Sequence, residues 1–317
     1  MAIKILKKTK DLIKRSKLLF ALVKPFSNIV RIFLDKRFLY HYFQGVITNP
    51  ETRSYLAKIE SNFYKVENRF SNKTDLLRKD SYIESPLIIS NEKVIQINSF
   101  LNTLRCHDQV DSSYKFDINS RPRDCHLAHY DSSELFKSEQ IIEIAVENTL
   151  IEIYNDLYGC DPIIDHIAAW WSFPSSESHN TQHWHRDLDS LNLLKFLIYL
   201  TDVDAESGPH YLIPGSHNSK ISTAKYKKHD DKEFEDIIKQ NGTKAFLGPA
   251  GTNFLENTFA FHKGTNPIEK PRLLLEVIYS RVQTPYTDKK PFINLNDPAF
   301  SNLIKENIEL FEGKIIH

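Results

Sequence analysis

The chain of 317 residues contains 41 Lys and Arg and 41 Asp and Glu, so its formal net charge is zero. This balance provides no overall field that would favour nucleic acid or another anionic macromolecule as a partner. A hydrophobic content of 41%, with 20 Phe and 14 Tyr, is enough for a sizeable core. The length fits one large domain with additions or two modest domains.

The cysteines and the apolar segments bear on the cellular compartment. Cys106, Cys125 and Cys160 are too few and too scattered for a disulfide framework or a zinc site, which favours a reducing compartment. No apolar run reaches transmembrane length, and no signal-peptide pattern with a cleavage site is present. We therefore expect a cytoplasmic protein.

Residues 1–37 differ in composition from the rest of the chain. Eleven Lys and Arg face only Asp11 and Asp35, a net charge of +9, and apolar residues recur at helical spacing up to Pro25. One interpretation is an interfacial helix that associates the protein with the inner surface of an anionic membrane. The other is an amphipathic helix packed on its own domain or on a second subunit. Both stay open, and we assign residues 1–45 to a basic N-terminal helical extension.

The segment before the centre of the chain is mainly helical by pattern. We predict helices over residues 51–68, over 92–104 with Asn91 as the cap, and over 139–158 with Gly159 as the stop. Residues 107–131 are expected to form strands and loops, in which His126 and His129 are interpreted as surface or supporting residues rather than metal ligands. A strand is expected over 163–173, with Trp170 and Trp171 on opposite faces.

Two further elements are predicted nearer the C-terminus. Residues 218–241 form a polar insert, with a short helix over 232–239 that is capped by Asp231 and stopped near Gly242. The insert is interpreted either as a lid over an active site or as solvated decoration. A last helix is expected from Asp297-Pro298 to about Phe311, ending at Gly313.

The chemistry is concentrated in residues 181–216, for which we predict a β-hairpin or a longer β-meander with a buried strand over 193–200. On a strand His185 and Asp187 share one face, about 7 Å apart. They are two of the three ligands in the 2-His-1-carboxylate arrangement that holds non-haem Fe(II). His183 shares this face and could replace His185 as a metal ligand. The His-x-Asp spacing favours His185 over His183.

Four motifs resemble the phytanoyl-CoA dioxygenase family in order and spacing: Trp184-His185-Arg186-Asp187, Tyr199-Leu200-Thr201-Asp202-Val203-Asp204, Gly208-Pro209 and Pro214-Gly215-Ser216-His217. This family consists of Fe(II)- and 2-oxoglutarate-dependent oxygenases. The resemblance implies a mainly β fold with flanking helices (α+β) and a double-stranded β-helix (jelly-roll, cupin-like) core, which we place in a single domain over residues 46–317.

The family also has a late histidine that is followed about ten residues later by an arginine, and this chain offers His262 and Arg272. We expect His262, 77 residues after His185, to complete the metal site. Arg272 suits the far carboxylate of 2-oxoglutarate, because its planar guanidinium binds a carboxylate through two hydrogen bonds and stays charged.

Further polar residues are weighed for contact with the cosubstrate. Lys195 lies in an apolar strand, so its ammonium is expected to pair with an anion, to reach the cosubstrate or substrate, or to emerge at the surface. Tyr199 and Thr201 share its parity and are weaker candidates for the same contact. His210 and His217 are interpreted as turn and hydrogen-bonding residues.

The resemblance implies a hydroxylase that converts 2-oxoglutarate and O2 to succinate and CO2 while it hydroxylates an unactivated C–H bond, with no residue needed as acid or base. Halogenating relatives carry a small residue at the position of Asp187, so the carboxylate favours hydroxylation. The substrate is an unidentified small molecule, lipid or glycan. The alternatives are a cupin-like metal-binding protein (a sensor, a binding module or a non-oxidative enzyme) and a membrane-peripheral scaffold. Arg272 favours the oxygenase.

Overall fold

The computed structural model describes residues 50–63, 74–175, 182–219, 234–284 and 290–316, all within the compact unit Thr48–His317. The predictions for residues 1–45, and for most of the insert, fall outside these ranges. No helix within them is long and apolar enough to cross a membrane.

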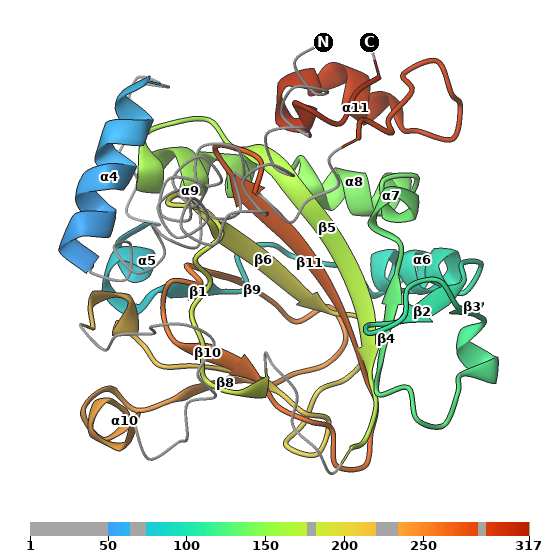
Figure 1. Cartoon of the computed structure of the whole chain (residues 1–317), viewed down its shortest axis with the longest axis horizontal. Helices are drawn as coiled ribbons and strands as arrows, with labels where there is room; N and C mark the ends of the chain where they lie inside the picture. Colours follow the sequence, from blue (N-terminus) through green and yellow to red (C-terminus); the bar gives the residue numbers. More distant parts are fainter. Residues whose placement is uncertain (1–49, 64–73, 176–181, 220–233, 285–289, 317) are drawn as a thin grey trace, which may run out of the picture. The chain divides into compact units, whose positions relative to one another are not determined.

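The described residues form two antiparallel sheets (Figure 1). The larger sheet has the order β1-β9-β6-β11-β5-β4-β2-β3 and the smaller one has the order β10-β7-β8. The strands of the larger sheet are β1 (Tyr82–Glu84), β2 (Cys106–Asp108), β3 (Lys115–Phe116), β4 (Leu127–Tyr130), β5 (Ile163–Ser172), β6 (Leu194–Tyr199), β9 (Asn253–Glu256) and β11 (Arg272–Ser280). Those of the smaller sheet are β7 (His210–Leu212), β8 (Lys244–Phe246) and β10 (His262–Gly264). Together with the flanking helices they confirm the predicted double-stranded β-helix.

Side chains alternate between the two faces of the larger sheet. On β11, Leu273, Leu275 and Val277 belong to the largest hydrophobic cluster, which also contains residues of the flanking helices. Arg272 and Glu276 alternate with them and line a cavity instead. The face of the larger sheet that carries the cavity therefore bears the polar chemistry, while the opposite face holds most of the core.

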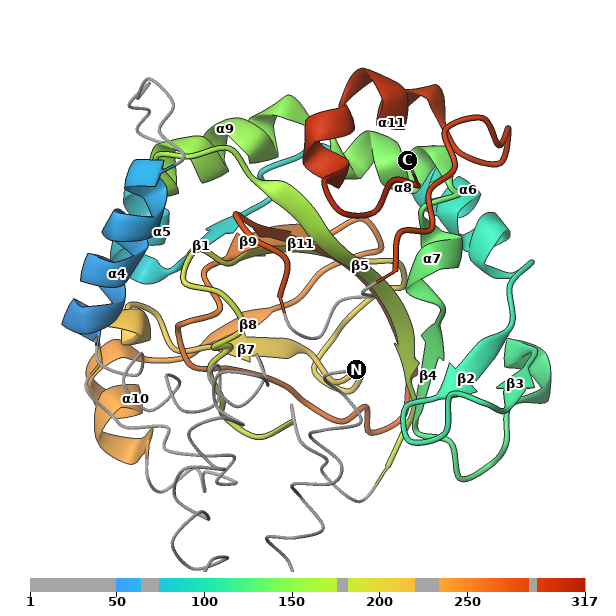
Figure 2. The same cartoon turned by 45° about the horizontal axis from the view of Figure 1, so that its top comes forward.

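Helices cover the core face of the larger sheet, and the smaller sheet lies on its other side (Figure 2). The α-helices are α4 (Pro50–Phe63), α5 (Thr74–Asp80), α6 (Asn91–Leu101), α7 (Ser132–Leu135), α8 (Glu139–Ala145), α9 (Asn148–Tyr158), α10 (Glu235–Asn241) and α11 (Asn302–Glu306). The short 3-10 helices are η1 (Ile118–Ser120), η3 (Ser216–Asn218) and η5 (Ile308–Phe311).

The single helix predicted over residues 139–158 is wrong, because the structure divides it into α8 and α9. Glu147 has an extended backbone conformation with ψ 121°, so the chain changes direction after Ala145 and each half buries its own apolar face. The predicted stop is confirmed, since Gly159 is the C-cap of α9 with φ 71° in the left-handed region.

Two predicted helix starts, those of α6 and α11, have a different cap in the structure. Ser90, and not Asn91, caps α6 with a side chain that accepts from the Lys93 N–H. Asp297 caps a turn instead of a helix, and α11 starts later, after the cap Ser301. In each case the serine adopts the extended backbone conformation that a cap requires. The insert helix α10 starts at Glu235, later than predicted, and its N-cap is Phe234 rather than Asp231, which lies outside the described residues. The predicted stop is confirmed, since Gly242 is its C-cap.

The predicted β-hairpin or longer β-meander over residues 181–216 is also wrong, although its buried strand is present as β6. The chain pairs with β10 only through an isolated bridge between His185 and His262, then crosses to the larger sheet as β6 and returns to the smaller sheet as β7. A double-stranded β-helix alternates between its two sheets in this way, so β6 and β7 lie in different sheets and are not paired with each other.

The turn between β6 and β7 offers a test of the packing. Gly208 has φ +70°, and a Cβ added there would lie 2.5 Å from both Pro267 N and Thr265 O. Gly242 has nearly the same φ, +71°, but nothing lies within 4 Å of an added Cβ. We expect Gly208→Ala to lower the free energy of unfolding by about 3 kcal/mol or more, and Gly242→Ala by about 1 kcal/mol. Urea denaturation checks both values, and equal losses would contradict the role of the contact.

Candidate metal centre and its cavity

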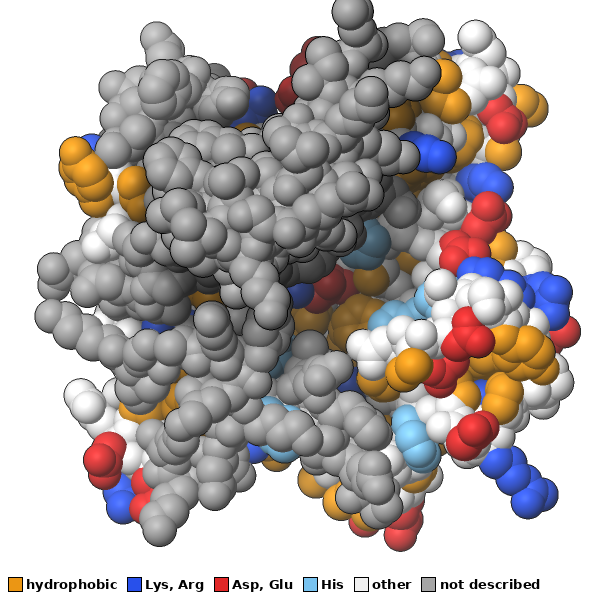
Figure 3. Space-filling view, viewed as in Figure 1, with side chains coloured by type: hydrophobic (Ala, Val, Ile, Leu, Met, Phe, Trp, Pro, Cys, Tyr) orange, Lys and Arg blue, Asp and Glu red, His pale blue; other side chains and the backbone are white. Residues whose placement is uncertain are grey.

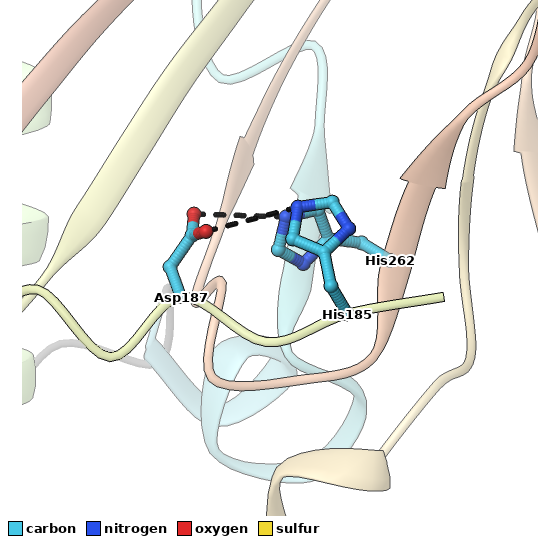
Figure 4. A group of neighbouring side chains, drawn as sticks. All are labelled: His185, Asp187 and His262. Carbon is cyan, nitrogen blue, oxygen red and sulfur yellow. Dashed lines mark ion pairs between the residues drawn. The ribbon is translucent and has the colours of Figure 1, made fainter. Parts of the chain in front are cut away.

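Three side chains converge at the edge of the smaller sheet: His185, Asp187 and His262 (Figure 4). Within the described residues they form the one cluster of at least three His, Cys, Asp or Glu suited to a metal ion, with their ligand atoms within 4.8 Å of one another. Asp187 Oδ1 lies 3.8 Å from His185 Nε2, and Asp187 Oδ2 lies 3.6 Å from His262 Nε2. The cluster contains the three residues that the sequence analysis selected and excludes His183.

The backbone sets the spacing of the two imidazoles. His185 N donates to His262 O, and His262 N donates to His185 O, each at 3.0 Å. Each ring also donates from Nδ1 to a carbonyl two residues earlier, that of His183 at 2.8 Å and that of Ala260 at 3.0 Å. These bonds leave both Nε2 lone pairs directed at the Asp187 carboxylate and available to a metal.

The electrostatic environment prepares the same protonation states that a metal needs. Burial, together with the neighbouring His185, lowers the pKa of His262 to about 4, so its imidazole is neutral at pH 7. Burial alone would favour protonated Asp187, but the Lys195 ammonium and the two imidazoles hold the pKa of this carboxyl well below its usual range. A divalent cation can therefore bind at neutral pH without displacing a proton from Asp187 or His262.

A cavity of about 270 Å3 adjoins the metal cluster and is lined by residues of both sheets. In Figure 3, acidic, basic and histidine side chains are visible in the hollow near the centre of the view. Arg272 lies in this cavity and is 5% exposed. Its Nη2 donates to Ser172 Oγ at 3.3 Å, whereas Nε and Nη1 are buried and have no hydrogen-bond partner in the described ranges. A buried guanidinium with free donors is a site for an anion.

Lys195 pairs with two carboxylates. Its Nζ lies 2.9 Å from Asp187 Oδ2 and 3.1 Å from Glu276 Oε2. Burial disfavours the ammonium, but these two carboxylates raise the pKa of Lys195 above its usual range. The structure thus shows the expected pairing with an anion, and its partners are protein carboxylates. Contact of Lys195 with the cosubstrate stays a prediction.

Tyr199 and Thr201 do not line the cavity, and the backbone uses their hydroxyl groups. Tyr199 Oη donates to Phe246 O at 3.1 Å and accepts from the His210 N–H at 3.0 Å. Thr201 Oγ1 accepts from the Leu273 N–H at 3.1 Å. Contact of these two residues with the cosubstrate stays a prediction.

The remaining histidines have various roles. His217 Nδ1 contacts Ser81 Oγ, and His129 lines the cavity, where it stacks on Trp170 with ring centroids 5.8 Å apart. Neither His126 nor His129 belongs to the metal cluster found among the described residues. His183 supplies a carbonyl to His185.

The interpretation of His210 as a turn residue is wrong, whereas its predicted hydrogen-bonding role is confirmed. It is a buried residue of β7 whose Nε2 donates to Glu256 Oε2 at 3.0 Å and whose ring stacks on His262. The sequence analysis also missed Glu256 and Glu276 in the cavity. Burial raises the pKa of Glu256 to about 7. A charged residue inside an apolar strand is the sequence signal that identified Lys195. The same signal could have identified Glu256 and Glu276.

The sequence profile of the phytanoyl-CoA dioxygenase (PhyH) family matches residues 127–266. Residues 127–266 are therefore similar to a phytanoyl-CoA dioxygenase domain. The match includes His185, Asp187 and His262, whereas Arg272 lies just beyond it. The predicted resemblance is confirmed, and with it the prediction of an Fe(II)- and 2-oxoglutarate-dependent oxygenase. No curated protein sequence matches this chain significantly.

Solved structures similar to the phytanoyl-CoA dioxygenase domain confirm the fold. EctD from S. alaskensis with bound Fe has a TM-score of 0.53 at 18% identity, covering 71% of this chain and 85% of EctD. EctD with 2-oxoglutarate and 5-hydroxyectoine has a TM-score of 0.52 at 17% identity, covering 72% and 86%. The non-haem alpha-ketoglutarate-dependent epimerase SnoN from nogalamycin biosynthesis has a TM-score of 0.50 at 14% identity, covering 72% and 95%.

Proposed function

We propose that this protein hydroxylates an unactivated C–H bond of a small-molecule, lipid or glycan substrate. His185, Asp187 and His262 would hold Fe(II), and Arg272 would bind the far carboxylate of 2-oxoglutarate. The observation that supports this most directly is the pairing of a three-residue metal cluster with a buried guanidinium that has free donors in the same cavity.

The donor set fits iron. Two imidazoles and one carboxylate are the ligand types of non-haem Fe(II) oxygenases, and three protein ligands leave coordination positions for 2-oxoglutarate and O2. When bound, Fe(II) supplies the activation of O2, with 2-oxoglutarate as the reductant that leaves as succinate and CO2. One oxygen atom of O2 enters succinate and the other enters the hydroxylated product, so the reaction balances without a protein acid or base.

The protein residues position the reactants and exclude water. The bonds from His185 and His262 to backbone carbonyls fix the ligating nitrogens before a metal arrives. Lys195 holds the Asp187 carboxylate from the side of β6. Arg272 orients the diacid by its far end, so that its keto acid end can face the metal cluster.

Asp187 and Arg272 support hydroxylation over the alternatives. SnoN is named as an epimerase, so the fold alone leaves the outcome open. Asp187 occupies the position at which halogenating relatives carry a small residue, and this favours oxygen transfer. Arg272 favours an oxygenase over a cupin-like binding protein, because a protein that takes no diacid has no need for a buried guanidinium there. Membrane association through residues 1–37 and a cytoplasmic location stay predictions.

The reaction itself gives the experiment. Purified protein with Fe(II), 2-oxoglutarate and O2 is screened against small molecules, lipids and glycans for stimulated succinate formation, and hits are examined by mass spectrometry under 18O2. We expect a product that has gained one labelled oxygen atom. If 2-oxoglutarate did not bind to the Fe(II) form, the proposal would fail.

A further inference from the structure

Glu256 at the end of β9 is a buried carboxylate in the cavity with one oxygen unused. The side chain is 0% exposed and lines the cavity. Its Oε2 accepts from His210 Nε2 at 3.0 Å, and its Oε1 is buried without a hydrogen-bond partner among the described residues. A buried acceptor that lacks a donor destabilises the protein unless a ligand supplies one. Glu256 is therefore poised to receive a hydrogen-bond donor.

Lys195, the cation that faces Glu256 on the neighbouring strand, forms its ion pairs with other carboxylates. Lys195 on β6 lies opposite Glu256 on β9, but its ammonium is engaged by Asp187 and Glu276 at 2.9 and 3.1 Å. Each of those carboxylates thus has a cationic partner. Among the described residues, Glu256 has a neutral imidazole as its only hydrogen-bond partner.

The formal charges of the metal cluster and the cavity indicate which kind of hydrogen-bond donor Glu256 would accept from. The metal cluster and the cavity together hold the carboxylates of Asp187, Glu256 and Glu276 against the cations Lys195 and Arg272. Fe(II) and the doubly negative 2-oxoglutarate cancel each other. With Glu256 ionised, one negative charge then remains in the filled site, and a buried charge requires a partner of opposite sign. Burial raises the pKa of Glu256 to about 7, so this carboxylate is fully ionised at neutral pH only when a cation pairs with it.

We propose that Glu256 determines substrate specificity by accepting a hydrogen bond from a protonated amine, so that the substrate is a small cationic amine. This inference rests on the proposed function, because the charge count includes iron and 2-oxoglutarate. His129 and Trp170, stacked in the same cavity, provide an aromatic wall for the apolar part of such a molecule.

Two ligands of similar shape, one cationic and one neutral, test whether Glu256 selects a positively charged group. Benzylammonium and benzyl alcohol are titrated into the Fe(II)·2-oxoglutarate form under argon, and their dissociation constants are compared for the wild-type protein, Glu256→Gln and Glu306→Gln. Glu306 is an exposed residue of α11 and serves as the matched control. We expect the wild type and Glu306→Gln to bind the amine at least about tenfold more tightly than the alcohol, and Glu256→Gln to lose this preference.

Each outcome is decisive. Equal binding of the two probes by the wild-type protein, absence of amine binding, or a preference that persists in Glu256→Gln would overturn the inference. The comparison within the wild type holds even if the variant does not fold. Formation of the Fe(II)·2-oxoglutarate complex is measured first by its charge-transfer absorption. If this complex fails to form, the proposed function is what has failed, whereas a formed complex without amine preference overturns the role of Glu256 alone.

Discussion

The Asp187→Ala variant is expected to retain less than about 1% of wild-type 2-oxoglutarate turnover, because it removes the one anionic ligand of the metal cluster. The fold should persist, since Asp187 lies in an irregular segment and its backbone N–H still reaches the Thr258 carbonyl, at 2.9 Å in the structure. Equilibrium dialysis against Fe(II) under argon measures metal binding, and succinate formation in air measures turnover.

The two histidines on either side of Trp184 provide the matched comparison. His185→Ala should lose Fe(II) binding as Asp187→Ala does, whereas His183→Ala should keep it, because His183 contributes only its carbonyl to the site. Circular dichroism confirms that each variant is folded. Turnover retained by folded Asp187→Ala, or lost equally in His183→Ala and His185→Ala, would contradict the assignment of the ligands.

The Arg272→Gln variant is expected to raise the KM for 2-oxoglutarate by about 100-fold or more while leaving Fe(II) affinity unchanged. Loss of two charge-assisted hydrogen bonds to a carboxylate corresponds to about 3 kcal/mol or more. A second measurement separates binding from a structural role. Because the guanidinium is buried with two nitrogens unpartnered in the described part of the chain, its removal should leave the thermal stability of the ligand-free protein unchanged or higher.

Arg281, just past the other end of β11, is the control for Arg272. Its Nη2 lies 3.2 Å from Glu312 Oε2, so Arg281→Gln removes a cation without touching the cavity. This variant should keep the wild-type KM, and 2-oxoglutarate should still raise its melting temperature in the presence of metal. A ligand-free Arg272→Gln protein that is strongly destabilised would indicate a structural role for the guanidinium.

Elements with a clear local pattern could be predicted from the sequence. The strands β5 and β6 follow from apolar runs in the sequence. The stop of α9 follows from Gly159, because its backbone conformation favours glycine. The metal cluster could be predicted because a short motif supplied His185 and Asp187, while the spacing of the family supplied His262.

The rest depends on contacts that a local pattern does not encode. The break at Glu147 exists because α8 and α9 bury separate apolar faces, and a continuous helical period does not reveal a change of direction. The hairpin prediction failed because strand partners in this fold are distant in sequence. The ion pair of Glu276 was missed because its partner, Lys195, lies on a strand that is adjacent in the sheet but distant in sequence.

The reciprocal hydrogen bonds between His185 and His262 make the spacing of the two imidazoles a property of the polypeptide backbone. Any non-proline pair can form such bonds, so the spacing of the two imidazoles does not depend on the side chains that shape the cavity. Substrate preference can thus change through cavity residues outside the Lys195 ion pairs, such as Glu256 on β9, while the two histidine ligands keep their spacing. One scaffold can in this way acquire new substrates without having to rebuild its metal site.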